Sequence, residues 1–246
     1  MGSRIGLIAG SGELSRAVLA EAKKSGSFCA VAGLRGAAPA GLEREADAFA
    51  WFGPADLDEL IFGEALGNGA IRALAAALPD HSPTTLLRAL IEYLGAAGIA
   101  VRDPSRFLEP YGCPEGVLVP AAVPEAVEAE IAFGWPLVRA LADLDIGQTL
   151  VVKDRAVVAV EGMEGTDEAV RRGAALAGSG VVVLKAARTR QDPRVDLPMV
   201  GLETVRTLVE AGAAALVIEA GRVPFFQREE ARAAAAAGGV ALIGRR

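Results

Sequence analysis

Residues 4–12 have the sequence RIGLIAGSG, in which an apolar run is followed by a Gly-Ser-Gly turn. An apolar run of this kind, bounded by glycines, is typical of a strand buried in a parallel sheet. Residues 13–24 follow with apolar side chains at helical spacing. The segment therefore predicts a strand over residues 4–10, a tight turn and a helix, which together begin a β-α-β fold.

The same alternation continues through the N-terminal half. We expect further strands at residues 28–34, 48–52 and 99–102, and helices at residues 54–66, 70–78 and 82–94. Residues 103–124 are rich in Pro and Gly and are expected to form a connecting loop. The prediction is an N-terminal domain over residues 1–125 with a small, Rossmann-like parallel sheet.

The C-terminal half, residues 126–246, is predicted to be a second, mixed α/β domain. A helix is expected at 124–141, and a hairpin of strands 150–153 and 156–160 around Asp154 and Arg155. The remaining elements are expected to be helices at 166–176, 202–211 and 228–236 and strands at 181–184, 215–219 and 240–243. Thr166 is expected to cap the first of these helices.

Composition excludes several classes of protein. The 246 residues are 52% hydrophobic and only 5% aromatic, which predicts a globular core built from Ala, Val, Leu and Ile. A net charge of −6 disfavours a nucleic-acid partner. The sequence has neither an apolar run of about 18 residues nor the pattern of a signal peptide. We therefore expect a cytoplasmic protein without a membrane-spanning helix.

Histidine and cysteine are too scarce to predict a zinc site. The chain has one histidine, His81, and two cysteines, Cys29 and Cys113, which lie far apart without ligand spacing. His81 is expected to be a solvated loop residue, and the cysteines are expected to be buried thiols. A metal site would then have oxygen ligands, which favours Mg²⁺ or Mn²⁺.

The glycine turn after the first strand indicates a possible ligand site. Gly10, Ser11 and Gly12 would let backbone N–H groups approach a phosphate or sugar at a helix N-terminus. The full dinucleotide motif is absent, because Ser15 replaces its third glycine and residues 34–36 contain no acid for a ribose. A turn without a ligand, a phosphate or sugar contact, and an NAD site remain alternatives.

The segment after the predicted hairpin is rich in acids. Glu161, Glu164 and Asp167 lie within seven residues, around Gly165 and Thr166. Helix capping explains the threonine and one acid. Three acids around glycines suggest in addition a hard cation or a hydrogen-bonded sugar.

Charged residues of both signs follow the next strand. Lys185 ends that strand, where ligands of α/β proteins usually bind, and a charged loop spans residues 190–201. Lys185 and Arg194 are candidates for phosphate contacts, and Asp196 for a metal or a water. This set of residues suits phosphoryl chemistry, whereas the lysine motif of P-loop NTPases is absent. A solvated charged loop is the alternative.

Ordered motifs in the chain resemble those of the LpxI-type UDP-2,3-diacylglucosamine pyrophosphatases. The motifs are residues 5–12, 144–148, 159–161, 164–167 and 194–198, together with Lys185, Gly201, Thr204 and residues 219–222. The resemblance extends over the C-terminal half and about the first forty residues.

The resemblance implies a cytoplasmic enzyme of lipid A biosynthesis, peripheral to the inner membrane, that takes a lipid-linked nucleotide sugar between two domains. It would hydrolyse UDP-2,3-diacylglucosamine with Mg²⁺ to UMP and 2,3-diacylglucosamine 1-phosphate. The family's essential aspartate falls on Asp196. A homodimer is possible.

We therefore predict three sets of site residues. The catalytic residues would be Asp196, Lys185 and Arg194. The substrate would contact Gly10, Ser11, Gly12, Gln148, Gly165, Thr166 and Asp167. The metal ligands would be Asp196, Glu164 and Asp167.

The chain departs from the family pattern mainly in its N-terminal half. Ser15 stands where the family commonly has proline, residues 67–78 form a shortened segment, and Gln227 replaces an aspartate. A non-catalytic or altered-substrate relative that binds a nucleotide sugar, and an NAD-linked oxidoreductase, therefore remain alternatives. The apolar run at residues 223–226 predicts either core packing or an opening for the lipid.

Overall fold

The computed structural model describes residues 3–53, 78, 83–96, 98–119, 123–194 and 197–246. The chain divides into two compact units. The first comprises residues 1–108 with a short segment at 193–196, and the second comprises residues 109–192 and 197–246. Each unit contains one of the two sheets, and the predicted α/β class is confirmed.

The sheet of the first unit has three parallel strands. They are β1 (Arg4–Ala9), β2 (Phe28–Leu34) and β3 (Ala48–Phe52), in the order β1-β2-β3. Helix α1 (Leu14–Lys24) packs on β1 and β2 and buries Val18 and Leu19. The glycine turn leads into this helix, and Gly12 has the positive φ of 85° that the turn requires. The predicted strand, turn and helix are confirmed.

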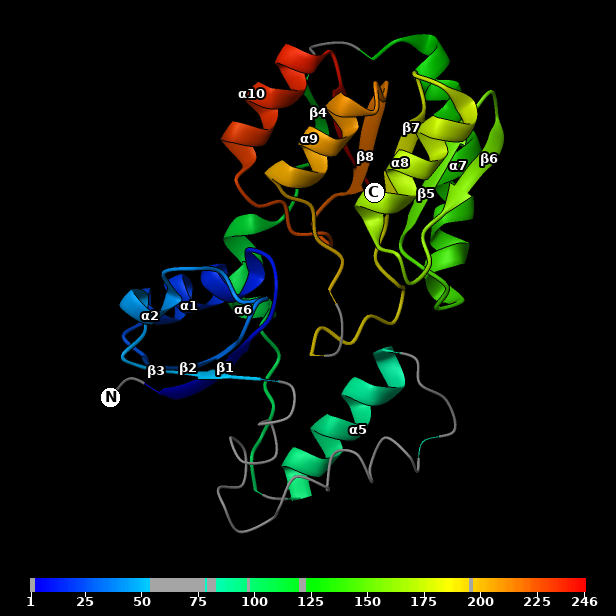
Figure 1. Cartoon of the computed structure of the whole chain (residues 1–246). Coiled ribbons are helices and arrows are strands. Elements are labelled where there is room, and N and C mark those ends of the chain that lie inside the picture. Colours follow the sequence, from blue (N-terminus) through cyan, green and yellow to red (C-terminus); the bar gives the residue numbers. More distant parts are fainter. Residues whose placement is uncertain (1–2, 54–77, 79–82, 97, 120–122, 195–196) are drawn as a thin grey trace. The chain divides into compact units, whose positions relative to one another are not determined.

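Three further helices complete the described part of the first unit (Figure 1). They are α2 (Leu42–Glu45), α5 (Pro83–Ala96) and α6 (Ser105–Leu108), and α6 packs against α1. The prediction of a strand at residues 99–102 is wrong. Ile99 is exposed there, and this short run pairs with no described strand, so no ladder forms. The predicted helix at 54–66 and His81 lie outside the described residues, and of the predicted helix at 70–78 only residue 78, which forms a bend, is described.

The second unit contains a six-stranded mixed sheet with the order β4-β9-β8-β7-β5-β6. The strands are β4 (Gly116–Val119), β5 (Thr149–Lys153), β6 (Ala156–Val160), β7 (Val182–Lys185), β8 (Ala215–Glu219) and β9 (Ala241–Arg245). Strands β7, β8 and β9 are parallel, whereas β5 runs antiparallel to its neighbours β6 and β7. Asp154 and Arg155 connect β5 and β6 with positive φ values of 53° and 55°, as a tight hairpin turn requires, and confirm the predicted hairpin.

The predicted loop at residues 103–124 is wrong in part. It contains α6, a short 3₁₀ turn (Glu109–Tyr111) and β4, which pairs antiparallel with β9. These elements are only three or four residues long, so they produce no periodic pattern in the sequence.

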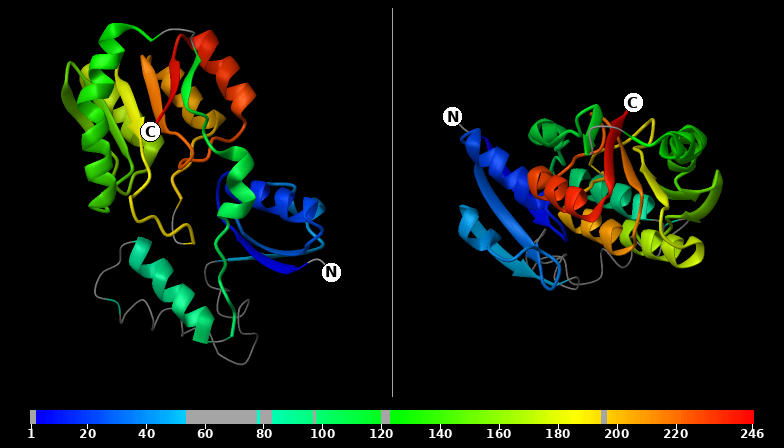
Figure 2. Two further views of the ribbon diagram at one scale, coloured as in Figure 1. Left: turned by 180° about the vertical axis from the view of Figure 1, so that it is seen from behind. Right: turned by 90° about the horizontal axis from the view of Figure 1, so that it is seen from above.

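Helices cover both faces of the second sheet (Figure 2). Helix α7 (Glu125–Asp143) lies on one face, and α8 (Thr166–Ala177), α9 (Leu202–Glu210) and α10 (Arg228–Gly238) lie on the other. Val151 and Val152, neighbours on β5, belong to the two opposite cores. Val223, Phe225 and Phe226 are at most 3% exposed, so the run at residues 223–226 is core.

Glycines let these helices approach the sheet closely. A Cβ atom at Gly134 on α7 would lie 2.7 Å from a methyl group of Leu184, and one at Gly173 on α8 would lie 2.6 Å from a methyl group of Val151. Small residues at the contacts reduce the volume that the core must fill. This packing explains how a chain with so few aromatic residues buries its sheet.

None of the helices in the described part of the chain is long and apolar enough to span a bilayer.

Both cysteines are buried free thiols, as predicted, and burial raises the pKa of Cys113 to about 11.

We predict that Gly173→Ala destabilises the protein although alanine is the better helix former. The added methyl group meets Val151, and such overpacking typically costs about 1–3 kcal/mol of unfolding free energy. Urea denaturation measures the loss. Adding Val151→Ala opens space for the methyl group. The double variant should therefore lose less unfolding free energy than the two single variants lose in sum. Strictly additive losses would contradict the close approach.

Candidate active site

The loops at one edge of the second sheet carry several of the predicted C-terminal site residues, among them Lys185, Thr166 and Gln148. Strands β7 and β8 end there, and β5 begins there, so that Thr149 lies opposite Lys185 in the ladder. Strand β6 ends at the same edge and leads into α8 through residues 161–165. This is the carboxyl edge of the parallel strands, where open α/β sheets bind their ligands.

Lys185 is buried at the end of β7, with only 4% of its surface exposed. Its Nζ donates to the hydroxyl of Thr149 at 3.0 Å and to the hydroxyl of Thr166 at 2.5 Å. A carboxylate oxygen of Glu161, Oε2, lies 3.8 Å from the same nitrogen. A buried ammonium is tolerated only when it is paired and hydrogen-bonded, and both conditions hold here.

Glu161 is the counter-ion of this cluster. Its Oε1 accepts the Thr166 hydroxyl at 2.8 Å, and its Oε2 accepts the backbone N–H of Gln148 at 3.1 Å. Burial by itself would raise the pKa of Glu161, but the charge of Lys185 and these hydrogen bonds hold the pKa below its ordinary value. The ion pair therefore persists at neutral pH.

Gly147 permits this arrangement. A Cβ atom there would lie 2.0 Å from the carbonyl oxygen of Glu161. The start of β5 therefore approaches the end of β6 more closely than any side chain would allow.

Helix α8 begins at the cluster. Its N-cap is Gly165, with φ 84°, and the prediction that Thr166 is the cap is therefore wrong. The Thr166 hydroxyl donates to Glu161, whereas a capping hydroxyl would accept a backbone N–H of the first turn. The first backbone N–H groups of a helix have no partner within it, so this end of α8 can receive an anion.

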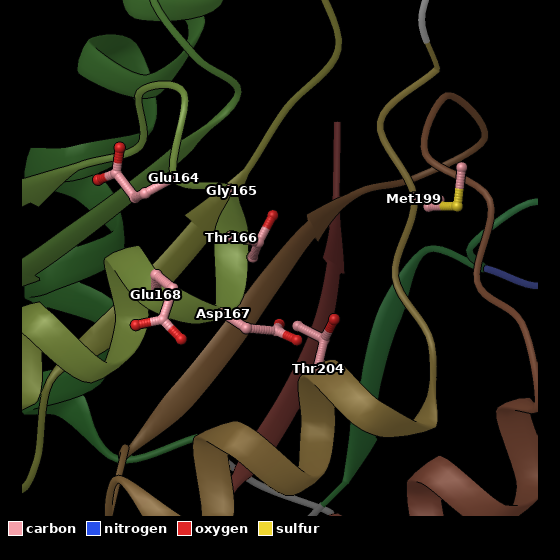
Figure 3. A pocket seen from close by; sticks show the side chains of 7 residues that line it. All are labelled: Glu164, Gly165, Thr166, Asp167, Glu168, Met199 and Thr204. Carbon is pink, nitrogen blue, oxygen red and sulfur yellow. The ribbon is translucent and has the colours of Figure 1, made fainter. Parts of the chain in front are cut away.

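A pocket of about 300 Å³ opens at this helix end (Figure 3). It is lined by Glu164, Gly165, Thr166, Asp167, Glu168, Met199 and Thr204. The side chains of Asp167, from α8, and Thr204, from α9, point toward one another, whereas Glu164 points away from them (Figure 3). Lys185 is not a lining residue, and Thr166 separates it from the pocket.

Two of the predicted metal ligands differ in their surroundings. Glu164 is engaged by Arg172 and by the N–H of Gly162, and the hydrogen bond from Arg172 lowers its pKa. Asp167 has a buried carboxylate oxygen, Oδ1, without a hydrogen-bond partner. No group of three carboxylate, histidine or cysteine side chains converges within the described ranges, which exclude Asp196.

The other predicted residues occupy different places. Gln148 is buried beside the cluster, and its backbone carbonyl oxygen accepts the N–H of Ala186 at 3.0 Å. Arg194 is exposed and is grouped with the first unit, so this geometry does not include it. The turn of Gly10, Ser11 and Gly12 also belongs to the first unit.

Sequence reasoning missed Thr149 as a partner of Lys185. Thr149 is fully buried, and only the antiparallel pairing of β5 with β7 places it opposite the lysine. A polar residue directly before three apolar strand residues was the available signal. Thr204 was noted only as part of the resemblance, and its place in the pocket follows from the packing of α9 beside α8.

The fold and the site define a two-domain α/β protein with a helix-end pocket and a buried lysine behind it. The LpxI C-terminal domain matches residues 114–243, and the LpxI N-terminal domain matches residues 4–66. The chain belongs to the LpxI family.

A curated relative from Caulobacter vibrioides (strain ATCC 19089 / CIP 103742 / CB 15) is named UDP-2,3-diacylglucosamine pyrophosphatase LpxI. It is 29% identical over an alignment of 274 residues, which covers 98% of this chain and 97% of the relative. Because the alignment is longer than the chain of 246 residues, the relative has residues that this chain lacks.

We predict that Glu161→Gln lowers the free energy of unfolding at pH 7 by about 3–5 kcal/mol, because it leaves the buried Lys185 without a counter-ion. The folded-state pKa of Glu161 is depressed. The ion pair therefore contributes fully above the unfolded-state pKa of about 4.3 and is lost as the pH falls through the folded value. The variant should lose less stability than the wild type between pH 6 and pH 3.

Urea denaturation across this pH series measures both effects. The double variant Glu161→Gln, Lys185→Met removes both charges and should recover much of the stability at pH 7. An acid-side slope in Glu161→Gln equal to that of the wild type would contradict the role given to the ion pair.

Proposed function

We propose that this chain hydrolyses the pyrophosphate bond of UDP-2,3-diacylglucosamine and releases UMP and 2,3-diacylglucosamine 1-phosphate. The observation that supports this most directly is the buried Lys185 behind a pocket at a helix N-terminus, in a member of the LpxI family. In the reaction, water adds to one phosphorus atom, and the bridging oxygen leaves with the other phosphate.

The charge of the pyrophosphate is the main problem that such a site must solve. The N–H groups at the start of α8 offer donors for phosphate oxygens from the pocket wall. Lys185 lies one hydrogen bond behind Thr166, and its positive charge acts on the pocket across that hydroxyl. Because Glu161 and the two threonines fix the ammonium, no reorganisation is needed when charge develops in the transition state.

We propose that the remaining predicted residues also take part in substrate binding or catalysis. Arg194 would neutralise phosphate oxygens, and Asp196 would bind a metal or orient the attacking water. Gln148, beside the cluster, and Gly10, Ser11 and Gly12, at the glycine turn, would contact the nucleotide sugar.

Magnesium, or manganese in its place, is the cofactor that suits this donor set. The orphaned Oδ1 of Asp167 is a hard oxygen ligand, and Asp196 would supply another. Glu164, whose carboxylate is held by Arg172, fits a supporting role better than direct ligation. A bound divalent cation would neutralise negative charge on the pyrophosphate.

The substrate is an amphipathic lipid, so we propose that the protein is cytoplasmic and works at the surface of the inner membrane. The buried run at residues 223–226 would not form the lipid opening, because its apolar side chains belong to the core. A homodimer remains a prediction.

Asp196→Ala tests the mechanism. We expect turnover to fall by at least about 100-fold, or about 2.7 kcal/mol, while the melting temperature and product binding are retained. Release of UMP from UDP-2,3-diacylglucosamine with Mg²⁺ measures turnover. Asp192→Ala, which removes a carboxylate from the same loop, is the matched control. A folded Asp196→Ala protein with wild-type turnover would refute the assignment.

The wild-type protein itself separates the two functional alternatives. Binding of the substrate without release of UMP would favour a nucleotide-sugar-binding relative over an enzyme.

Metal removal tests the cofactor. We expect dialysis against EDTA to abolish UMP release, and Mg²⁺ or Mn²⁺ to restore it, because oxygen ligands prefer these cations. Zn²⁺, which favours nitrogen and sulfur ligands, is the control addition. Full turnover after EDTA treatment would show that the reaction proceeds without a divalent cation.

A further inference from the structure

The backbone that follows β7 is unusual in its hydrogen bonding. Residues 186–189 form neither helix nor strand, yet each of their N–H groups has a partner. Ala186 donates to the carbonyl of Gln148 at 3.0 Å. The next three N–H groups donate to side chains: Ala187 to Glu219 at 2.8 Å, Arg188 to Gln191 at 3.1 Å, and Thr189 to Asp143 at 2.6 Å.

Two carbonyl groups of this segment are held by one arginine. Arg222 donates through Nη2 to the carbonyl oxygen of Arg188, and to that of Thr189 at 3.4 Å. Its Nη1 donates to Oε1 of Glu219 at 3.2 Å. The guanidinium of Arg222 thus links the loop backbone to Glu219, whose carboxylate accepts the N–H of Ala187.

Asp143, at the end of α7, fixes the segment from another side. Its Oδ1 accepts the N–H of Thr189, and its Oδ2 accepts the hydroxyl of the same residue at 2.7 Å. Arg188 forms an ion pair with Asp145. The segment is therefore fixed by side chains from α7, from the loop after α7 and from the end of β8.

The far end of the same loop is fixed by backbone bonds. The N–H of Val200 donates to the carbonyl of Pro224, and the N–H of Phe226 donates to the carbonyl of Val200, each at 2.9 Å. Both ends of the loop between β7 and α9 are thus attached to the second unit. Between these ends lies the segment that contains Arg194 and Asp196.

We propose that Asp143, Glu219 and Arg222, here called the loop anchor, are positioning residues for the reaction. None of them lines the pocket, and all three bond the loop or one another. Glu219 is only 3% exposed. An apolar residue there would cost less desolvation, so the buried carboxylate is better explained by the geometry that it imposes than by stability.

The loop anchor acts by fixing where the chain leaves the second unit toward Arg194 and Asp196. A displacement of about 1 Å in a group near the reacting atoms can lower the rate by about 100-fold. The positioning role rests on the proposed function. The attachment of the loop does not, and it can be measured without substrate.

Arg222→Ala tests the anchor. It leaves the carbonyl oxygens of Arg188 and Thr189 without this donor, while the sheet and pocket residues remain. We expect faster trypsin cleavage after Arg190 and Arg194 and a fall in kcat of about ten- to a hundredfold, with KM changed by less than about threefold. Arg232→Ala, which removes a half-buried α10 arginine that pairs with Glu229, is the matched control.

Rescue distinguishes positioning from loss of folded protein. Methylguanidinium can replace the missing donors and should restore part of the kcat of Arg222→Ala, whereas a protein that is merely less stable would gain nothing from a guanidinium salt. The Asp143 pair is the second test. Asp143→Asn keeps an acceptor for the Thr189 N–H and should stay close to wild type, and Asp143→Ala should behave like Arg222→Ala.

The outcomes separate the two levels of the proposal. Unchanged cleavage after Arg190 and Arg194 would overturn the anchoring. Two results would overturn the positioning role. One is faster cleavage with an unchanged kcat. The other is a fall in kcat that methylguanidinium does not rescue, together with equal effects of Asp143→Asn and Asp143→Ala. A wild-type protein that releases no UMP, with cleavage still accelerated in Arg222→Ala, would overturn the proposed function and leave the anchored loop established.

Discussion

The arrangement of the second unit's functional edge depends on one buried charge. Lys185 ends β7 inside the protein, and its ammonium must be balanced where it lies. Glu161 from the end of β6, Thr149 from the start of β5 and Thr166 from α8 all contribute to that balance. The requirement brings residues from four elements of the second unit to one point, at the place where α8 begins and the pocket opens.

Much of the fold could be predicted because its strands are apolar runs bounded by glycines. The strands of the first unit and the hairpin around Asp154 followed directly from these patterns. Short elements such as α6 and β4 could not be predicted, since three or four residues give no period. The strand predicted at residues 99–102 does not form, because a short apolar run forms a strand only beside a partner strand.

The site was predictable in its residues but less so in their roles. The acids after β6 were recognised as a group, yet the structure separates them: Glu161 neutralises a lysine, Glu164 pairs with Arg172, and Asp167 faces the pocket. Spacing along the chain cannot distinguish these fates, because each depends on a partner from another element. The partners of the loop after β7 were hidden for the same reason, since Asp143 and Arg222 are far from Thr189 in sequence.

The hydrogen bonds of the Thr166 hydroxyl have fixed directions. Its single hydrogen is directed to Glu161, and one of its lone pairs receives Lys185. The Thr149 hydroxyl lies 3.4 Å from the same oxygen, so the Thr166 hydroxyl is engaged within the cluster, and the pocket lining offers acceptor oxygens on Asp167 and Thr204 instead. The pocket therefore presents acceptors beside the N–H groups at the start of α8. A ligand that matches both must place a hydrogen of its own, such as that of a sugar hydroxyl or a bound water, next to its anionic oxygens.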